Sequence, residues 1–260
     1  MAGEVQSLLR GLALCEALAD YDGNGVGLTL LAKKVGLTPS TTHRLLATLV
    51  EEGYVTRSQE NNNYVLGHRI IGVAASVRRR TAHIRVLAHK HLEAIAQATG
   101  ETVNLVVLEE NRSVYIDQAD GAGAFRVSLR IGSTFPAHTS ASAKAILAFQ
   151  ASDEQVGSLF LDKDLRKLTK NTIVDVATFK AQLLEVRELG YAVEEEEVET
   201  GVSCVAAPVL LNGKIAVAAI SVPGPTGRIL VPGAERLGRI VSQHARTLSA
   251  ELDAAVGRRK

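Results

Sequence analysis

Residues 28–66, LTLLAKKVGLTPSTTHRLLATLVEEGYVTRSQENNNYVL, contain two short helical patterns followed by two β-prone segments. The first helix is predicted over 30–35, and Gly36 with Leu37 makes a tight turn. The second helix is predicted to start at residue 39 and to end before Gly53. The segments YVTR at 54–57 and NYVL at 63–66 flank the polar turn SQENNN, which is typical of a two-stranded wing.

Capping residues support both helix starts. Thr29 is suited to be the N-cap of the first helix. Thr38 and Pro39 form an N-cap and N1 pair, because proline lacks only an N–H that the first helical turn would leave unpaired anyway. Gly53 stands where a C′ glycine is expected. Four residues of the second helix share one face, which we expect to be buried: Thr42, Leu45, Leu46 and Leu49.

A third helix is predicted upstream, over Val5–Ala19, and the glycine-rich residues 21–27 end it. Helix, turn, helix and wing within about 65 residues is the build of a winged helix-turn-helix, in which the second helix of the motif enters the DNA major groove. The apolar positions of the upstream helix recur at helical spacing and are expected to form its buried face: Val5, Leu8, Leu9, Leu12, Cys15 and Ala19.

The remaining face of the helix starting at Pro39 is polar, and it predicts a DNA-contacting surface. Hydroxyls can contact phosphates, and Arg44 can donate two hydrogen bonds to a guanine edge. The alternative is a solvated face on a helical module that contacts other proteins. The candidate DNA-binding residues are Thr38, Ser40, Thr41, Thr42, His43, Arg44 and Thr48.

Composition and charge place few constraints on function. The 260 residues carry a net charge of +1. Residues 1–80 hold 9 Lys/Arg against 7 Asp/Glu, net +2, and residues 81–260 hold 20 against 21, net −1. No apolar run approaches the roughly 20 residues of a membrane span, and no secretory signal is seen, so a cytoplasmic protein without membrane contact is expected. Cys15 and Cys204 are expected to be reduced thiols.

The C-terminal part is predicted to be an α+β domain with an antiparallel sheet flanked by helices. A linker helix is expected from about Gly67 to Arg80, and a separate amphipathic helix from Ile84 to Ala98. EENR at 109–112 and NGK at 212–214 are suited to hairpin turns. Strands are predicted at Thr102–Leu108, Val114–Gln118, Phe125–Leu129, Val205–Leu211 and Ile215–Val222, and helices at Ser142–Gln150, Asp153–Leu161, Val176–Leu189 and Pro232–Val256.

The chain resembles the IclR family of bacterial transcriptional regulators along its whole length. The resemblance implies a winged helix-turn-helix DNA-binding domain at 1–67, a linker helix at 68–80, and a GAF-like effector-binding and oligomerisation domain at 81–260. It implies a repressor that binds a palindromic operator as a dimer or a dimer of dimers. The stretches that carry it include LTLLAKKVGLTPSTTHRLLATLVEEGYV, YVLGHR, GETVNLVVLE, FPAHTSASAKAILA and LGYAVEEEEVETGVSCVAAPV.

An effector site is expected where PAHTSASAKAILA places Ser140 or Ser142 at the start of a helix, because free N–H groups there favour an anion such as a small carboxylate. Similarity to a glyoxylate-responsive family member implies the effector-binding residues Ala141, Ser142, Glu194, Cys204 and Ser221. This chain has Glu194 in place of an aspartate, Pro223 in place of a serine and Ala143 in place of a glycine. Glyoxylate and pyruvate therefore stay open beside aromatic acids, sugar acids and other catabolic intermediates.

The rival interpretation is a small-molecule enzyme with an N-terminal interaction module. His138, Ser140, Ser142 and Lys144 lie close in sequence, but no G-x-S-x-G elbow is present and no catalytic residue is predicted. Lys144 is expected to be an anion partner or a surface charge. The acidic run 194–197 is expected to be largely solvated, with Glu194 as the exception. No metal site and no cofactor are predicted, and His83, His89 and His91 are interpreted as solvated or core residues.

Overall fold

The computed structural model describes residues 4–21, 24–123, 127, 129–150, 152–159, 165–231 and 233–257. The chain divides into two compact units, Met1–Arg80 and Thr81–Lys260. We call them the N-terminal and C-terminal units and describe each separately. Helices and an antiparallel sheet make up the architecture, which confirms the predicted α+β class.

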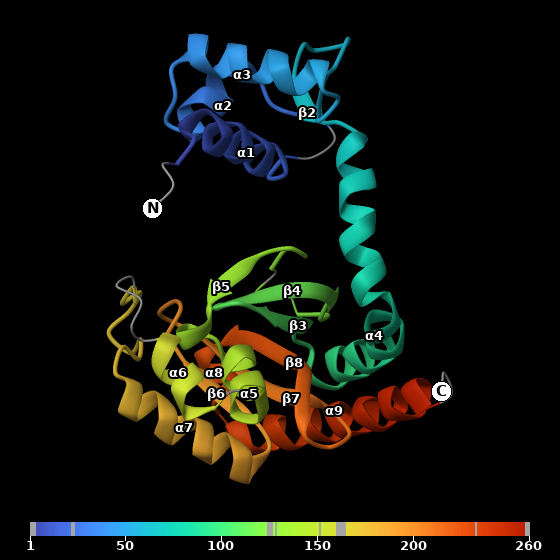
Figure 1. Ribbon diagram of the computed structural model, residues 1–260, viewed down its shortest axis with the longest axis vertical. Helices are drawn as coiled ribbons and strands as arrows, with labels where there is room; N and C mark the ends of the chain where they lie inside the picture. The colour runs from blue at the N-terminus through green and yellow to red at the C-terminus, as the bar shows by residue number, and fades with distance from the viewer. Residues whose placement is uncertain are drawn as a thin grey trace. The chain divides into compact units, whose positions relative to one another are not determined.

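The N-terminal unit has the predicted helix, turn, helix and wing (Figure 1). Strands β1 and β2 pair antiparallel, with Val55 opposite Leu66. The elements are α1 (Gln6–Leu18), α2 (Leu28–Lys34), α3 (Pro39–Glu51), β1 (Val55–Arg57) and β2 (Tyr64–Leu66). Their core is formed mainly by Leu14, Leu18, Val26, Leu31, Leu46, Val55 and Tyr64.

The predicted start and end of α3 are confirmed. The Thr38 side chain accepts a hydrogen bond from the Thr41 backbone N–H at 3.3 Å, and Gly53 has a φ of +73° just after the helix. The predicted cap of α2 is wrong. Thr29 lies inside α2, and Gly27 holds the N-cap position without a side-chain bond, because Val26 is still paired with Tyr64 in a β-bridge.

The predicted buried face of α1 is wrong. Apolar residues surround much of this helix, and the side that packs in the core carries Leu14, Ala17 and Leu18. Four of the six residues predicted to be buried instead form an exposed apolar stripe, 47–61% accessible, which we call the α1 stripe: Val5, Leu8, Leu9 and Leu12.

A single helix, α4 (Arg69–Thr99), replaces the two helices predicted between Gly67 and Ala98. The division into units falls within it, between Arg80 and Thr81. No proline or glycine lies between Val73 and Thr99, so nothing in the sequence interrupts the backbone hydrogen bonds at the arginine run. The three arginines are part of the helix and do not end it.

The C-terminal unit is built on a six-stranded antiparallel sheet in the order β5-β4-β3-β8-β7-β6. Both predicted hairpin turns are confirmed, since Glu109 pairs with Arg112 and Leu211 with Ile215. Residues 125, 126 and 128 of the predicted strand at 125–129 lie outside the described residues, and Val127 and Leu129 are not in a strand. The strands are β3 (Val103–Glu109), β4 (Arg112–Ala119), β5 (Thr134–Pro136), β6 (Ala192–Glu195), β7 (Val202–Leu211) and β8 (Ile215–Pro225).

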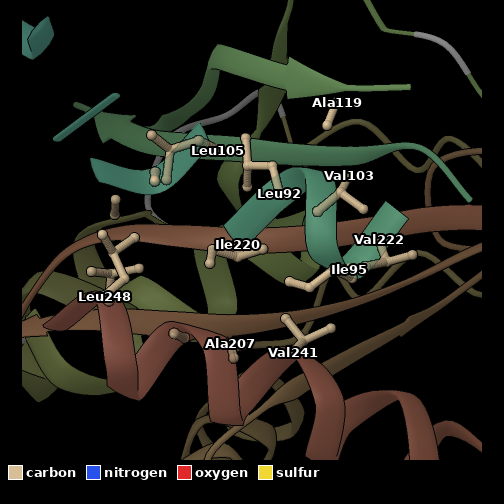
Figure 2. Close-up of a cluster of buried hydrophobic side chains, with 14 of the residues drawn as sticks. Leu92, Ile95, Val103, Leu105, Ala119, Ala207, Ile220, Val222, Val241 and Leu248 are labelled. Atoms are coloured by element: carbon tan, nitrogen blue, oxygen red, sulfur yellow. The ribbon is translucent and has the colours of Figure 1, made fainter. Parts of the chain in front are cut away.

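Helices cover both faces of this sheet. Figure 2 shows Leu92 of α4 and Val241 of α9 in one cluster with strand residues such as Leu105 and Ile220. A second cluster joins the opposite face to α5 and α7. Among the described residues, no helix is both long and apolar enough to cross a membrane. The helices are η1 (Ala137–Thr139), α5 (Ala141–Gln150), α6 (Asp153–Leu159), α7 (Val176–Leu189), α8 (Thr226–Ile229) and α9 (Ala234–Gly257).

Candidate functional site

The polar face of α3 is a surface of the N-terminal unit. Most of the candidate DNA-binding side chains are exposed, and Thr41 is half-buried. Thr42 is fully buried, so it packs inside the unit and does not belong to this surface. The exposed members are Thr38, Ser40, His43, Arg44 and Thr48.

Internal hydrogen bonds divide these side chains into two kinds. The Thr38 hydroxyl donates to the Thr41 hydroxyl at 3.0 Å, and the Thr48 hydroxyl donates to the Arg44 carbonyl at 3.4 Å, so these hydroxyls are engaged within α3. The Arg44 guanidinium forms no ion pair within the described residues. It is therefore the side chain of this face best suited to an external anion or base edge.

The C-terminal unit contains a cavity of about 70 Å³ against the face of the sheet that α5 covers. Three of the five predicted effector residues line it: Ala141, Glu194 and Cys204. The other two, Ser142 and Ser221, are fully buried and do not reach the cavity wall.

Aromatic residues that the sequence analysis did not identify form another wall of the cavity. Tyr115 of β4 and Phe135 of β5 line it and contact each other edge to face, with ring centroids 5.7 Å apart. Burial raises the pKa of Tyr115 above its usual range, so the phenol is protonated at neutral pH. The alternation of residues along a β-strand can predict that Tyr115 is buried, but it cannot predict which cavity the side chain lines.

Glu194 lies on β6 opposite Cys204 of β7 and is 3% exposed. Its Oε1 accepts hydrogen bonds from the backbone N–H groups of Glu197 and Val198. Within the described residues, Oε2 has no hydrogen-bond partner, and the side chain lines the cavity. Burial raises the pKa of Glu194 to about 7, so near neutral pH the carboxyl is partly protonated.

Lys144 of α5 is fully buried, and its Nζ lies 2.5 Å from Glu197 Oε1. The expectation of a surface charge at Lys144 is wrong, and so is the expectation that Glu197 is solvated, because it is 3% exposed. Burial lowers the pKa of Lys144 and raises that of Glu197. The partners are 53 positions apart in the sequence, which explains why neither short-range pattern indicated the pair.

The predicted helix start at Ser140 is confirmed. Ser140 directly precedes the helix, and its hydroxyl accepts a hydrogen bond from the Ala143 backbone N–H at 3.4 Å. The first N–H groups of a helix have no acceptor within it. Burial raises the pKa of the Cys204 thiol well above its usual range, so the thiol is neutral and a poor nucleophile.

Comparisons with known proteins agree along the whole chain. Residues 7–59 match the family model of the IclR helix-turn-helix domain, and residues 74–250 match that of the bacterial transcriptional regulator IclR C-terminal domain. The acetate operon repressor of Salmonella typhimurium is 36% identical over 251 residues, covering 96% of this chain and 90% of the relative.

A second relative and a solved structure give the same result. The transcriptional repressor IclR of Escherichia coli is 36% identical over 249 residues, covering 95% of this chain and 90% of that protein. The crystal structure of Thermotoga maritima IclR superposes with a TM-score of 0.75 at 29% identity, covering 96% of this chain and all of the other.

Proposed function

The chain belongs to the IclR family of bacterial transcriptional regulators. We propose that it represses its target genes by binding an operator, and that a small effector changes its affinity for this operator. Its DNA-binding module is the helix-turn-helix of the N-terminal unit. Repression is supported by the similarity to two proteins that are named as repressors. The observation that carries the proposal is the exposed polar face of α3.

Operator recognition is assigned to six residues of this face and its N-cap. Arg44 would read a base in the major groove, and the hydroxyls would position the helix on phosphates. Thr42 is left out because it is buried. The proposed set is Thr38, Ser40, Thr41, His43, Arg44 and Thr48.

A homodimer on a palindromic operator follows from the small area that one winged helix presents to DNA. The α1 stripe supports this step. Contiguous exposed apolar residues on a small unit mark an interaction surface, and a second copy of the same helix would cover the stripe symmetrically. A dimer of dimers would require a further surface.

The effector is proposed to be a small carboxylate in the cavity of the C-terminal unit. Its carboxylate would accept hydrogen bonds at the start of α5, near Ala141 and Ser142, while Glu194 and Cys204 would form the polar wall. Ser221 is buried beside Cys204 and would act on the effector through that residue. An effector changes DNA affinity only if it favours one arrangement of the paired chains over another.

The alternative of a small-molecule enzyme is less well supported, since the relatives are named as transcriptional regulators. The Cys204 thiol is buried and neutral, and Lys144 is held in an ion pair with Glu197, so neither of these two residues is an activated nucleophile. A regulator of chromosomal DNA would work in the cytoplasm.

The test is a titration of labelled DNA from the gene's own upstream region with the purified full chain, with and without a panel of small carboxylates. We expect saturable binding that excess unlabelled random DNA does not compete away, and a shift in apparent affinity with at least one acid. Binding equal to that of random DNA, together with turnover of a small acid, would favour the enzyme instead.

A further inference from the structure

A larger pocket lies on the other side of the sheet from the cavity beside α5. Its volume is about 290 Å³, against about 70 Å³ for that cavity, and the described residues include none that lines both. The last turn of α4, helix α8 and the first turns of α9 form its walls, so we call it the α9 pocket. Ile229, Leu237 and Ile240 of these walls pack with the cluster that joins the sheet to α4 and α9.

Neighbouring residues of β8 separate the two sites. Pro223 lines the cavity beside α5. A Cβ atom added to Gly224 would instead meet Ile229 and Glu101 Oε2, and both of these residues line the α9 pocket. Successive residues of a strand face opposite sides of a sheet. A ligand in one site would therefore not displace a ligand from the other.

One wall of the α9 pocket carries a guanidinium in a fixed position. The Nε and Nη2 atoms of Arg228 donate to Glu101 Oε1 and Oε2 at 2.5 and 2.9 Å. The Glu101 side chain is 8% exposed and that of Arg228 is 47% exposed, so the carboxylate lies inside and the guanidinium lies at the pocket. Two parallel hydrogen bonds fix the plane of the guanidinium, and aromatic rings stack on such a plane.

A second guanidinium leaves the pocket with one uncompensated positive charge. Arg236 of α9 lines the pocket and is exposed, and its side chain forms no ion pair within the described residues. The neighbouring Glu235 pairs with Arg239 at 2.8 Å, and Glu101 pairs with Arg228. Among the described wall residues, the charges of Arg228 and Glu101 cancel and that of Arg236 remains. A carboxylate, with a single negative charge at neutral pH, matches this balance.

Much of the remaining wall is apolar and is not fully covered by the protein. Val231 is 68% exposed, and Leu237 and Ile240 are half-buried. Covering such surface from water is favourable. A small polar anion could neutralise Arg236 but would leave these side chains in contact with water, so the wall favours a ligand that joins an apolar body to its negative charge.

We propose that the α9 pocket is a second ligand-binding site of the protein and that it takes an aromatic carboxylate. Arg236 holds the carboxylate, and the ring lies between the fixed guanidinium of Arg228 and the apolar side chains of Leu237 and Ile240. The site is independent of the cavity beside α5 and of the effector proposed for it.

The experiment compares benzoate, benzamide and acetate by isothermal titration calorimetry on the full chain. Benzamide keeps the ring and lacks the charge, whereas acetate keeps the charge and lacks the ring. We expect benzoate to bind at least about tenfold more tightly than either, because it alone satisfies both walls. The absence of benzoate binding, or equal binding of benzoate and either analogue, would overturn the proposal.

A variant of Arg236 locates the bound benzoate. Arg236→Gln removes the uncompensated charge from an exposed position, so we expect a folded protein and a loss of benzoate affinity of at least about tenfold. Arg246→Gln is the matched control, because Arg246 is also an exposed arginine of α9 without an ion pair in the described part of the chain, and it does not line the α9 pocket. It should leave benzoate affinity unchanged.

A second variant tests the pocket by filling it and leaves its charges in place. Ala98→Trp adds a large side chain at an exposed residue of the last turn of α4, which lines the pocket. We expect the same loss of benzoate affinity, with a melting temperature close to that of the wild type. Wild-type benzoate affinity in a folded form of either Arg236→Gln or Ala98→Trp would place the ligand elsewhere and reject the α9 pocket as its site.

Discussion

Arg44 differs from its neighbours on α3 because the fold makes no use of its side chain. The hydroxyls of Thr38 and Thr48 already bond within the helix, and Thr42 is part of the core. A side chain that makes no contact on which the fold depends can be changed without unfolding the protein. The effect of such a change reports on DNA binding alone.

We therefore predict that Arg44→Ala weakens operator binding by about 1–3 kcal/mol, the usual worth of a bidentate base contact, and leaves random-sequence binding nearly unchanged. Fluorescence anisotropy at fixed salt measures both. Lys33→Ala, an exposed cation of α2, is the comparison and should affect the two DNAs alike. Equal losses on both DNAs for Arg44→Ala would assign Arg44 to phosphate.

The raised pKa of Glu194 predicts that the stability of the protein depends on pH. Burial raises its pKa from 4.5 to about 7, so between these values the folded state keeps a proton that the unfolded state releases. The free energy of unfolding must then decrease as pH rises through this range, by up to about 3 kcal/mol from this residue.

Glutamine at position 194 cannot titrate and can still accept the two backbone hydrogen bonds. The stability difference between Glu194→Gln and wild type should therefore shift in favour of the variant as pH rises from about 4.5 to 7, in urea titrations at several pH values. Using the difference removes the contribution of Glu197, whose pKa is also raised. A difference that is flat with pH would contradict the raised pKa.

At the scale of elements, α5 connects two parts of the cavity. Its first residues contribute Ala141 to the wall, and one turn later Lys144 pairs with Glu197, whose backbone N–H bonds Glu194. Helix α5 thus helps to position the Glu194 carboxyl group, because Lys144 holds Glu197 in the segment that follows β6. Lys144 is a positioning residue.

We predict that Lys144→Met lowers the free energy of unfolding by about 3–5 kcal/mol, because it leaves the Glu197 charge buried without a partner. The double variant Lys144→Met/Glu197→Leu should recover most of this loss, since an apolar pair can replace a buried ion pair at little cost. Chemical unfolding of the wild type and both variants measures the effect. A double variant no more stable than the single one would argue against the charge as the cause.

A structural feature could be predicted from the sequence where the residues that cause it lie within a few positions of it. Thr38, Pro39 and Gly53 act within a few residues, so the limits of α3 follow from them. The resemblance to the family indicated Glu194, Cys204 and Ala141, and these three residues line the cavity. Tyr115 and the Lys144–Glu197 pair depend on which distant segments meet, and no short pattern contains that information.

Helix faces and short strands show the same limit. The α1 stripe has the spacing of a buried face, and only the competing side with Leu14 and Leu18 decides which face packs. Strands β5 and β6 have three and four residues, too few for a clear alternation.

The whole molecule carries its two roles in separate units, and the α1 stripe belongs to the unit with α3. Pairing through α1 would fix the spacing of two α3 helices, and with it the distance between operator half-sites. Loss of the pair would cost operator affinity even with every α3 residue intact.

We predict that Leu8→Glu together with Leu12→Glu lowers the molar mass in sedimentation velocity and weakens operator binding, while the chain stays folded by circular dichroism. The charges would oppose each other across an apolar interface. Ile215→Glu, at a residue 54% exposed in the C-terminal unit, should change neither property. An unchanged mass in the double variant would place the dimer interface elsewhere.

The two outermost strands of the sheet affect how the protein behaves at high concentration. An open sheet edge is a template on which another chain can add a strand and start aggregation. Here one edge is the three-residue β5, whose last residue, Pro136, has no N–H to offer, and the other is the four-residue β6 with the acidic Glu195 exposed. Both edges are therefore poor seeds for intermolecular sheets, so the sheet can stay open at its sides without making the protein prone to aggregate.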